Sequence, residues 1–113
     1  MKSILIPTNK GPKIASEADI IRIEGNRNYC KIYFRNEKPL VVAKVLHWFQ
    51  DMLTEGAFCR IHKTHLVNRL YVIEIMKSSM FKRSNMLKLS NGDLLQISRR
   101  RKNYTGQLLQ QNC

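Results

Sequence analysis

Acidic residues are scarce in this chain of 113 residues, which has 8 Asp and Glu against 20 Lys and Arg and a formal net charge of +12. Residues 60–102 hold eleven of the basic residues and only Glu74 and Asp93 as acids, a net charge of +9. A field of one sign attracts polyanions, of which nucleic acid is the commonest; a membrane surface or an acidic protein comes next. The few scattered carboxylates also give little support to acid–base catalysis.

Long apolar runs and regularly spaced cysteines are missing as well. No run approaches the ~20 residues that cross a bilayer, and the apolar segment Ile4–Ile6 is too short for the core of a signal peptide. The three cysteines, Cys30, Cys59 and Cys113, are odd in number and irregularly spaced, which argues against a disulfide framework. We therefore expect a cytoplasmic protein of one domain with reduced thiols.

Motifs for catalysis and for metal binding are also lacking. The sequence has no Gly-rich phosphate loop and no nucleophile elbow, so we predict no enzymatic activity, no catalytic residues and no cofactor. Cys59, His62 and His65 follow one another at three-residue steps, but no further ligand cluster completes a zinc site. We predict that the protein binds no metal.

Strand patterns outnumber helix patterns along the chain. Alternating, β-branched and aromatic residues predict strands at Ile20–Glu24, Tyr29–Phe34, Leu70–Met76, Met86–Leu89 and Leu94–Ile97. Gly and Asn residues predict hairpin turns at 25–28 and at 90–93, where Asn-Gly is the strongest short hairpin signal. These patterns predict a mainly antiparallel β domain.

Helical periodicity is convincing in one segment. Apolar residues recur at three- and four-residue steps over Val41–Leu53, which predicts one long helix that ends near Gly56. Lys44 and His47 are its only basic residues, so its apolar stripe is expected to face the core rather than DNA. Short helical turns are expected at 64–67 and 98–104.

Three motifs resemble the LytTR family of DNA-binding domains. They are Ile-Glu-x-x-x-x-Tyr at 23–29, Phe-x-Arg-Ile-His-x-x-x-Leu-Val-Asn at 58–68, and Leu-x-Asn-Gly-x-x-Leu-x-Ile-Ser-Arg at 89–99. The string RIHKTHLVN at 60–68 is the most specific of them, and ISRR at 97–100 follows at the expected distance. The resemblance covers nearly the whole chain.

The resemblance implies an elongated, mostly β fold whose loops and turns, rather than a helix-turn-helix, enter successive major grooves. It implies an N-terminal arm at 1–13, a DNA-binding domain at 14–109 and a tail at 110–113. Many family members carry a receiver domain ahead of this module, and the chain is too short for one. We therefore expect a stand-alone bacterial regulator of transcription, similar to a response regulator, that binds double-stranded DNA at direct repeats as two copies.

The same motifs imply the residues of the DNA interface. Lys63 and Arg99 are expected at base edges, where an ammonium or guanidinium group can donate to guanine. Arg100, Arg101 and Lys102 are expected at phosphates, and His62 as a structural donor or a phosphate neighbour. The full set of expected DNA-binding residues is Arg27, Asn28, Arg60, His62, Lys63, Thr64, Arg69, Arg99, Arg100, Arg101 and Lys102.

Some interpretations remain open at this point. Asn68 is expected to cap or turn the chain with its side chain rather than to contact DNA. Tyr29 suits the core and the interface equally well. Tyr29, Tyr33 and Phe34 are the candidate stacking platform of an alternative, an RNA-binding module. A third hypothesis is a basic domain that binds an acidic protein.

Overall fold

The computed structural model describes residues 2–77 and 85–101. Within them the chain forms ten strands, one α-helix and three 3-10 helices (η). In chain order these elements are β1 (Ser3–Thr8), β2 (Gly11–Ser16), η1 (Glu17–Asp19), β3 (Ile20–Asn26), β4 (Tyr29–Phe34), β5 (Leu40–Val42), α1 (Leu46–Met52), β6 (Phe58–His62), β7 (His65–Asn68), η2 (Arg69–Tyr71), β8 (Val72–Lys77), β9 (Asn85–Leu89), β10 (Leu94–Ile97) and η3 (Arg99–Arg101).

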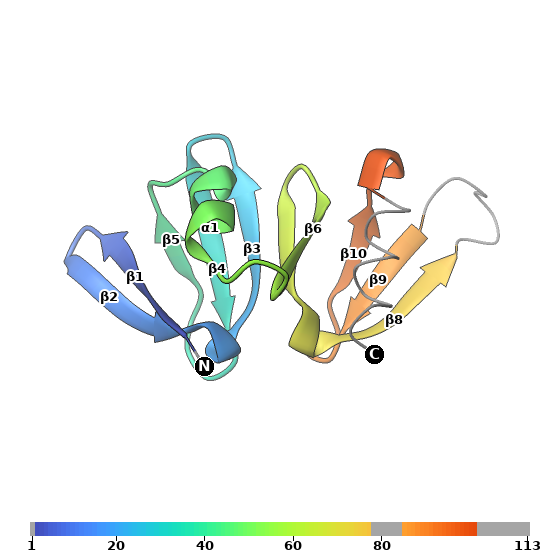
Figure 1. Cartoon of the computed structure of the whole chain (residues 1–113), viewed down its shortest axis with the longest axis horizontal. Helices are drawn as coiled ribbons and strands as arrows, with labels where there is room; N and C mark the ends of the chain where they lie inside the picture. Colours follow the sequence, from blue (N-terminus) through green and yellow to red (C-terminus); the bar gives the residue numbers. More distant parts are fainter. Residues whose placement is uncertain (1, 78–84, 102–113) are drawn as a thin grey trace.

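The strands form three antiparallel sheets. A central five-stranded sheet has the order β5-β4-β3-β7-β6, a second sheet has the order β10-β9-β8, and β1 and β2 form a hairpin of their own. The hairpin and the second sheet lie at opposite ends of an elongated molecule of 45 × 29 × 24 Å (Figure 1). The expected class, a mainly β fold, is thus observed.

Two apolar cores lie on the two faces of the central sheet. One core joins the sheet to α1 and to the β1–β2 hairpin, through buried side chains such as Ile6, Ile23 and Phe49. The other joins the sheet to β9 and β10, through residues such as Ile61 and Leu87. Strands with two covered faces need apolar residues on both, which explains why each of β3, β6 and β7 contains two consecutive buried apolar residues: Ile20 and Ile21, Phe58 and Cys59, and Leu66 and Val67.

The helix is shorter than the periodicity predicts. Residues Leu40–Val42 pair with β4 as strand β5, and only Leu46–Met52 is helical. Pairing places Val42 opposite Cys30, and both side chains are buried. Pairing in the sheet stabilises this β-branched segment more than one further helical turn would.

Two other local expectations differ from the structure. The segment 64–67 is not helical, because residues from His65 onward pair with both β3 and β6 as strand β7. The N-terminal residues expected as an arm form the β1–β2 hairpin, whose Ile4 and Ile6 are buried in the first core. In the described part of the chain, no helix is long and apolar enough to cross a membrane.

Candidate nucleic-acid interface

Three elements that carry expected DNA-binding residues end at one edge of the molecule, the upper edge in Figure 1. They are the β3–β4 turn at 27–28, the β6–β7 turn at 63–64, and η3. Backbone hydrogen bonds hold them together: Gly25 N donates to Thr64 O at 2.8 Å, and Ser98 N donates to Ile61 O at 2.8 Å. We name this edge the turn edge.

The β6–β7 turn presents Lys63 to solvent on a braced backbone. His62 pairs with His65, so the turn consists of two residues, and Lys63 is exposed. The His62 Nδ1 accepts a hydrogen bond from Thr64 N at 3.2 Å and lies 2.9 Å from Thr64 Oγ1. An Nδ1 that accepts leaves the proton of a neutral ring on Nε2. His62 therefore accepts a hydrogen bond through Nδ1 in this turn, and its expected role as a structural donor or a phosphate neighbour falls to Nε2 and stays a prediction.

Arg60 braces the same turn from below. Its Nη2 donates to Lys63 O at 2.6 Å, and its Nη1 donates to Gln50 Oε1 of α1 at 3.1 Å. Burial, followed by the charge of the nearby Arg101, lowers the pKa of Arg60 below its ordinary value. The proximity of Arg60 to Arg101 concentrates positive charge between the turn and η3.

The β3–β4 turn lies beside the N-terminal end of α1. Arg27 and Asn28 are both exposed, and Arg27 has a φ of 58°, in the left-handed region that a two-residue hairpin turn requires. A Cβ on Gly25 would lie 3.2 Å from the Leu46 Cβ, so the absence of a side chain lets helix and hairpin approach closely. Arg27, Arg60, Lys63 and His47 share one shallow groove there. Sequence reasoning did not place His47 in it, because only the tertiary fold brings α1 to this edge.

The third element continues directly from β10. Arg99 begins η3, Arg100 is exposed, and Arg101 is half-buried. The helical turn expected in this segment is therefore present. Lys102 lies outside the described residues.

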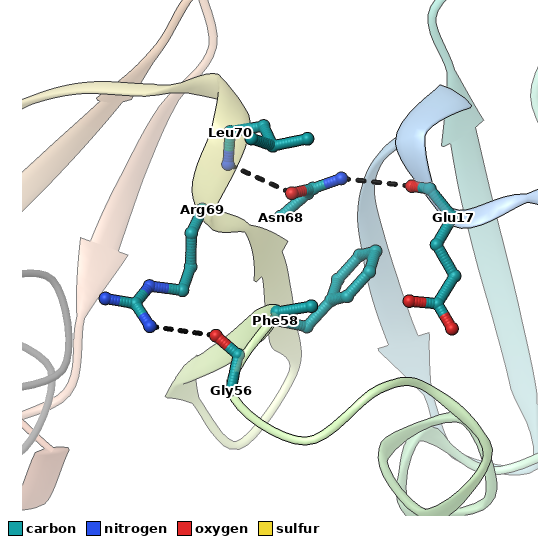
Figure 2. A pocket seen from close by; sticks show the side chains of 7 residues that line it. Glu17, Gly56, Phe58, Asn68, Arg69 and Leu70 are labelled. Carbon is teal, nitrogen blue, oxygen red and sulfur yellow. Dashed lines mark hydrogen bonds between the residues drawn. The ribbon is translucent and has the colours of Figure 1, made fainter. Parts of the chain in front are cut away.

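Arg69 begins η2, which follows β7 at the end opposite the β6–β7 turn, so it lies away from the turn edge. Its Nη1 donates to Gly56 O at 2.8 Å, at the rim of a pocket that also includes Glu17, Phe58 and Leu70 (Figure 2). The structure thus brings the other described candidate residues to one edge and leaves Arg69 apart from them.

Asn68 has the structural role expected of it. It is buried, its Oδ1 accepts from Leu70 N at 3.0 Å, and its Nδ2 donates to Glu17 O and Ile20 O (Figure 2). These bonds cap η2 and tie the end of β7 to η1.

The aromatic residues of β4 do not form an exposed stacking platform. Phe34 is buried in the first core, and Tyr33 packs beneath the Arg22 guanidinium, 3.9 Å from the ring centroid. Tyr29 is exposed. This arrangement removes the observation on which the RNA-binding alternative depended, because stacking of successive bases needs several accessible rings.

The histidines and cysteines near the β6–β7 turn do not gather as metal ligands. Among the described residues, no group of three His, Cys, Asp or Glu side chains is arranged to hold a metal ion. Cys59 is buried in the second core. Burial, opposed by the Glu24 carboxylate 3.9 Å from its Nδ1, lowers the pKa of His65 below its ordinary value.

Comparisons with known proteins found one family and one similar fold. A family model described as the LytTr DNA-binding domain matches residues 14–110. One similar solved structure is the LytTr DNA-binding domain of a protein described as a methyl-accepting/DNA response regulator from Bacillus cereus. It has a TM-score of 0.79 and 18% sequence identity, and the likeness covers 96% of this chain and 97% of that one, which shows a common fold. No curated protein sequence matches the chain.

Proposed function

The chain belongs to the LytTr DNA-binding domain family, and from this premise we propose that it binds double-stranded DNA in a sequence-specific manner to regulate transcription. The observation that carries the proposal is the turn edge, where two exposed hairpin turns and η3 present basic residues from three distant parts of the sequence. The proposal includes no catalytic role.

The dimensions of the molecule support contact with more than one groove. Its longest extent is 45 Å, and one turn of B-DNA is about 34 Å long. Elements distributed along such an edge can reach successive major grooves on one face of a duplex. The helix α1 is a poor alternative as a recognition helix, because it has seven residues and directs Leu46 and Phe49 into the core.

We propose different roles in DNA binding for the residues of the three elements. Lys63 reads a base edge from the tip of the β6–β7 turn, and Arg99 reads a second one from the start of η3, since both groups donate to guanine O6 and N7. Arg27 and Asn28 contact a base or phosphate from the β3–β4 turn. Arg60, His62 and Thr64 hold the Lys63 turn in shape.

Phosphate contacts supply the affinity that does not depend on sequence. Arg100, Arg101 and Lys102 are the residues that we assign to this role, because positive charge neutralises phosphates and releases counterions. We further propose that two copies bind direct repeats. We also expect the protein to be bacterial and cytoplasmic, where duplex DNA is present.

Selection of bound DNA from a random duplex pool tests the proposal. We expect a recurrent motif and a preference for duplex DNA over single-stranded RNA of the same composition. A pool that yields no motif, or tighter binding to the RNA, would contradict sequence-specific duplex binding. Loss of all nucleic-acid affinity at moderate salt would favour an acidic protein as the partner.

A further inference from the structure

A buried arginine joins the two sheets that carry the ends of the turn edge. Arg22 lies on β3 of the central sheet and is 7% exposed. Its Nε donates to Asp93 Oδ2 at 2.9 Å, and Asp93 belongs to the β9–β10 turn of the second sheet. Its Nη1 donates to Glu24 Oε1 at 3.0 Å, and its guanidinium covers the Tyr33 ring.

Asp93 is itself held in place within its turn. Asn91 Oδ1 accepts from Asp93 N, and Asn91 Nδ2 donates to Asp93 Oδ2, both at 3.0 Å. Leu89 N donates to Asp93 O at 2.9 Å. The position of the Asp93 carboxylate, and with it the bond to Arg22, is therefore tied to the position of the β9–β10 hairpin.

The rest of the contact between the sheets is mostly apolar, as in the second core. The driving force of apolar burial is not directional, so apolar contact constrains the relative orientation of the sheets less tightly than hydrogen bonds between fixed atoms do. A guanidinium that donates from fixed positions is directional. At this end of the sheets the Tyr71 hydroxyl also donates to Ala18 O, and at the turn edge Ser98 N donates to Ile61 O.

The relative orientation of the two sheets sets the position of η3 relative to the β6–β7 turn. The β6–β7 turn belongs to the central sheet, whereas η3 extends from β10 of the second sheet. We propose that the Arg22–Asp93 ion pair is a positioning device, which fixes the distance between the two DNA-contacting elements and thereby the spacing of the base pairs that they recognise. This inference rests on the proposed function and adds to it a determinant of spacing that contacts no DNA.

Arg22→Met tests the proposal. Methionine keeps much of the apolar volume of the side chain, and the two carboxylates that lose their partner have side chains 34% and 39% exposed, so water reaches both. Removal of one partner of an ion pair is most costly when the remaining charge stays buried, and the exposure of these two carboxylates limits that cost. Asp93→Asn serves as a milder second variant, and Glu37→Gln, which removes the exposed pair of Glu37 with Lys13, serves as the control.

The first readout needs no DNA. Amide hydrogen exchange, followed by NMR, compares Ser98 N–H, which bonds across the sheets, with Gly25 N–H, which bonds to Thr64 O within the central sheet. We expect Arg22→Met to accelerate exchange at Ser98 about tenfold more than at Gly25. Equal acceleration at both amides would indicate a general loss of stability and would overturn the positioning role.

The second readout uses the selected duplex and two versions in which the contacted base pairs are moved one base pair closer or further apart. We expect the parent and Glu37→Gln to prefer the selected spacing about tenfold, and Arg22→Met to lose most of that preference. Asp93→Asn, whose amide oxygen can still accept from Arg22, should lose a smaller part of it. Affinity for random duplex should stay within about twofold in all of them. An unchanged spacing preference in both variants overturns the inference. If the parent selects no duplex at all, the proposed function is overturned instead. The hydrogen-exchange readout does not depend on DNA binding and still tests the positioning role.

Discussion

The hydrogen bonds of Asn68 allow a quantitative prediction for Asn68→Ala. The side chain is 2% exposed and makes three hydrogen bonds of 2.9–3.0 Å to backbone atoms of Glu17, Ile20 and Leu70. A typical hydrogen bond contributes about 1 kcal/mol net to stability, and a buried group left without a partner costs about 1–3 kcal/mol.

The magnitude follows from what each partner retains. Glu17 O also accepts from Ile20 N, so it keeps one hydrogen bond in the variant. Leu70 is an exposed residue, and water can replace the lost acceptor of its N–H. The full cost of an unpartnered group then applies at most to Ile20 O, and we expect Asn68→Ala to lower the free energy of unfolding by about 2–4 kcal/mol. That is a large part of the roughly 5–15 kcal/mol typical of a domain.

Urea denaturation, followed by the fluorescence of Trp48, measures this change. Asn91→Ala is the matched control, because Asn91 also bonds to backbone and side-chain atoms but is exposed, and we expect it to cost less than about 1 kcal/mol. A loss for Asn68→Ala no larger than that of Asn91→Ala would refute the argument that the buried side chain ties β7 to η1.

Three further predictions concern charge and titration. If about five or six phosphates are neutralised, a plot of log K against log salt should fall with a slope near −5, and a slope near zero would show that the basic surface does not contact DNA. The lowered pKa of His65 keeps its folded imidazole neutral, whereas the unfolded chain takes up a proton as pH falls below about 6.5. The free energy of unfolding should therefore decrease as the pH falls from about 6.5 to the folded pKa. Urea midpoints at several pH values should show a smaller decrease in His65→Phe, and an equal decrease in both proteins would contradict this assignment. Burial raises the pKa of the Cys30 thiol to about 11, so alkylation of Cys30 at pH 8, followed by peptide mass spectrometry, should be slow until urea unfolds the chain. Rapid modification of Cys30 itself in the native protein would contradict its burial.

Local sequence signals predicted the strands correctly where a strand pairs with the next strand along the chain. The Asn-Gly turn predicted the β9–β10 hairpin, and strand β10 has the predicted bounds, Leu94–Ile97. Gly25 and the residues after it likewise predicted the β3–β4 hairpin, since its two strands are separated by only two residues. The family motifs predicted Lys63 among the DNA-binding residues, and the structure shows that it is exposed in the β6–β7 turn.

Long-range pairing accounts for most of what the sequence did not predict. Val41 and Val42 fit the helical pattern predicted for 41–53, and only pairing with the adjacent β4 edge makes them part of a strand. The residues after Lys63 form β7 because they pair on both sides with β3 and β6. The contact of Arg22 with Asp93 spans 71 positions in the sequence, and no local pattern in either segment indicates it.

Arg60 and His62 of the RIHKTHLVN string show a second limit of prediction from sequence. Arg60 and His62 have side chains suited to phosphate contact, and the motif placed them next to Lys63. The structure shows each of them bonded to the backbone of the turn, and their contact with DNA stays a prediction. Residue type and motif position cannot distinguish a side chain that touches a ligand from one that holds its neighbour, because both are required at the same place.

The most direct test of the account compares loss of one positive charge at the turn edge with loss of one elsewhere. Lys63 is exposed at the tip of the β6–β7 turn, and Lys38 is exposed on the β4–β5 connection at the opposite edge (Figure 1). Loss of a base contact costs about 1–3 kcal/mol on the specific site only. Lys63→Ala should therefore weaken binding to the selected duplex about tenfold or more and to random duplex far less, while Lys38→Ala leaves both within about twofold. Equal losses for the two variants would contradict the claim that DNA binds at the turn edge.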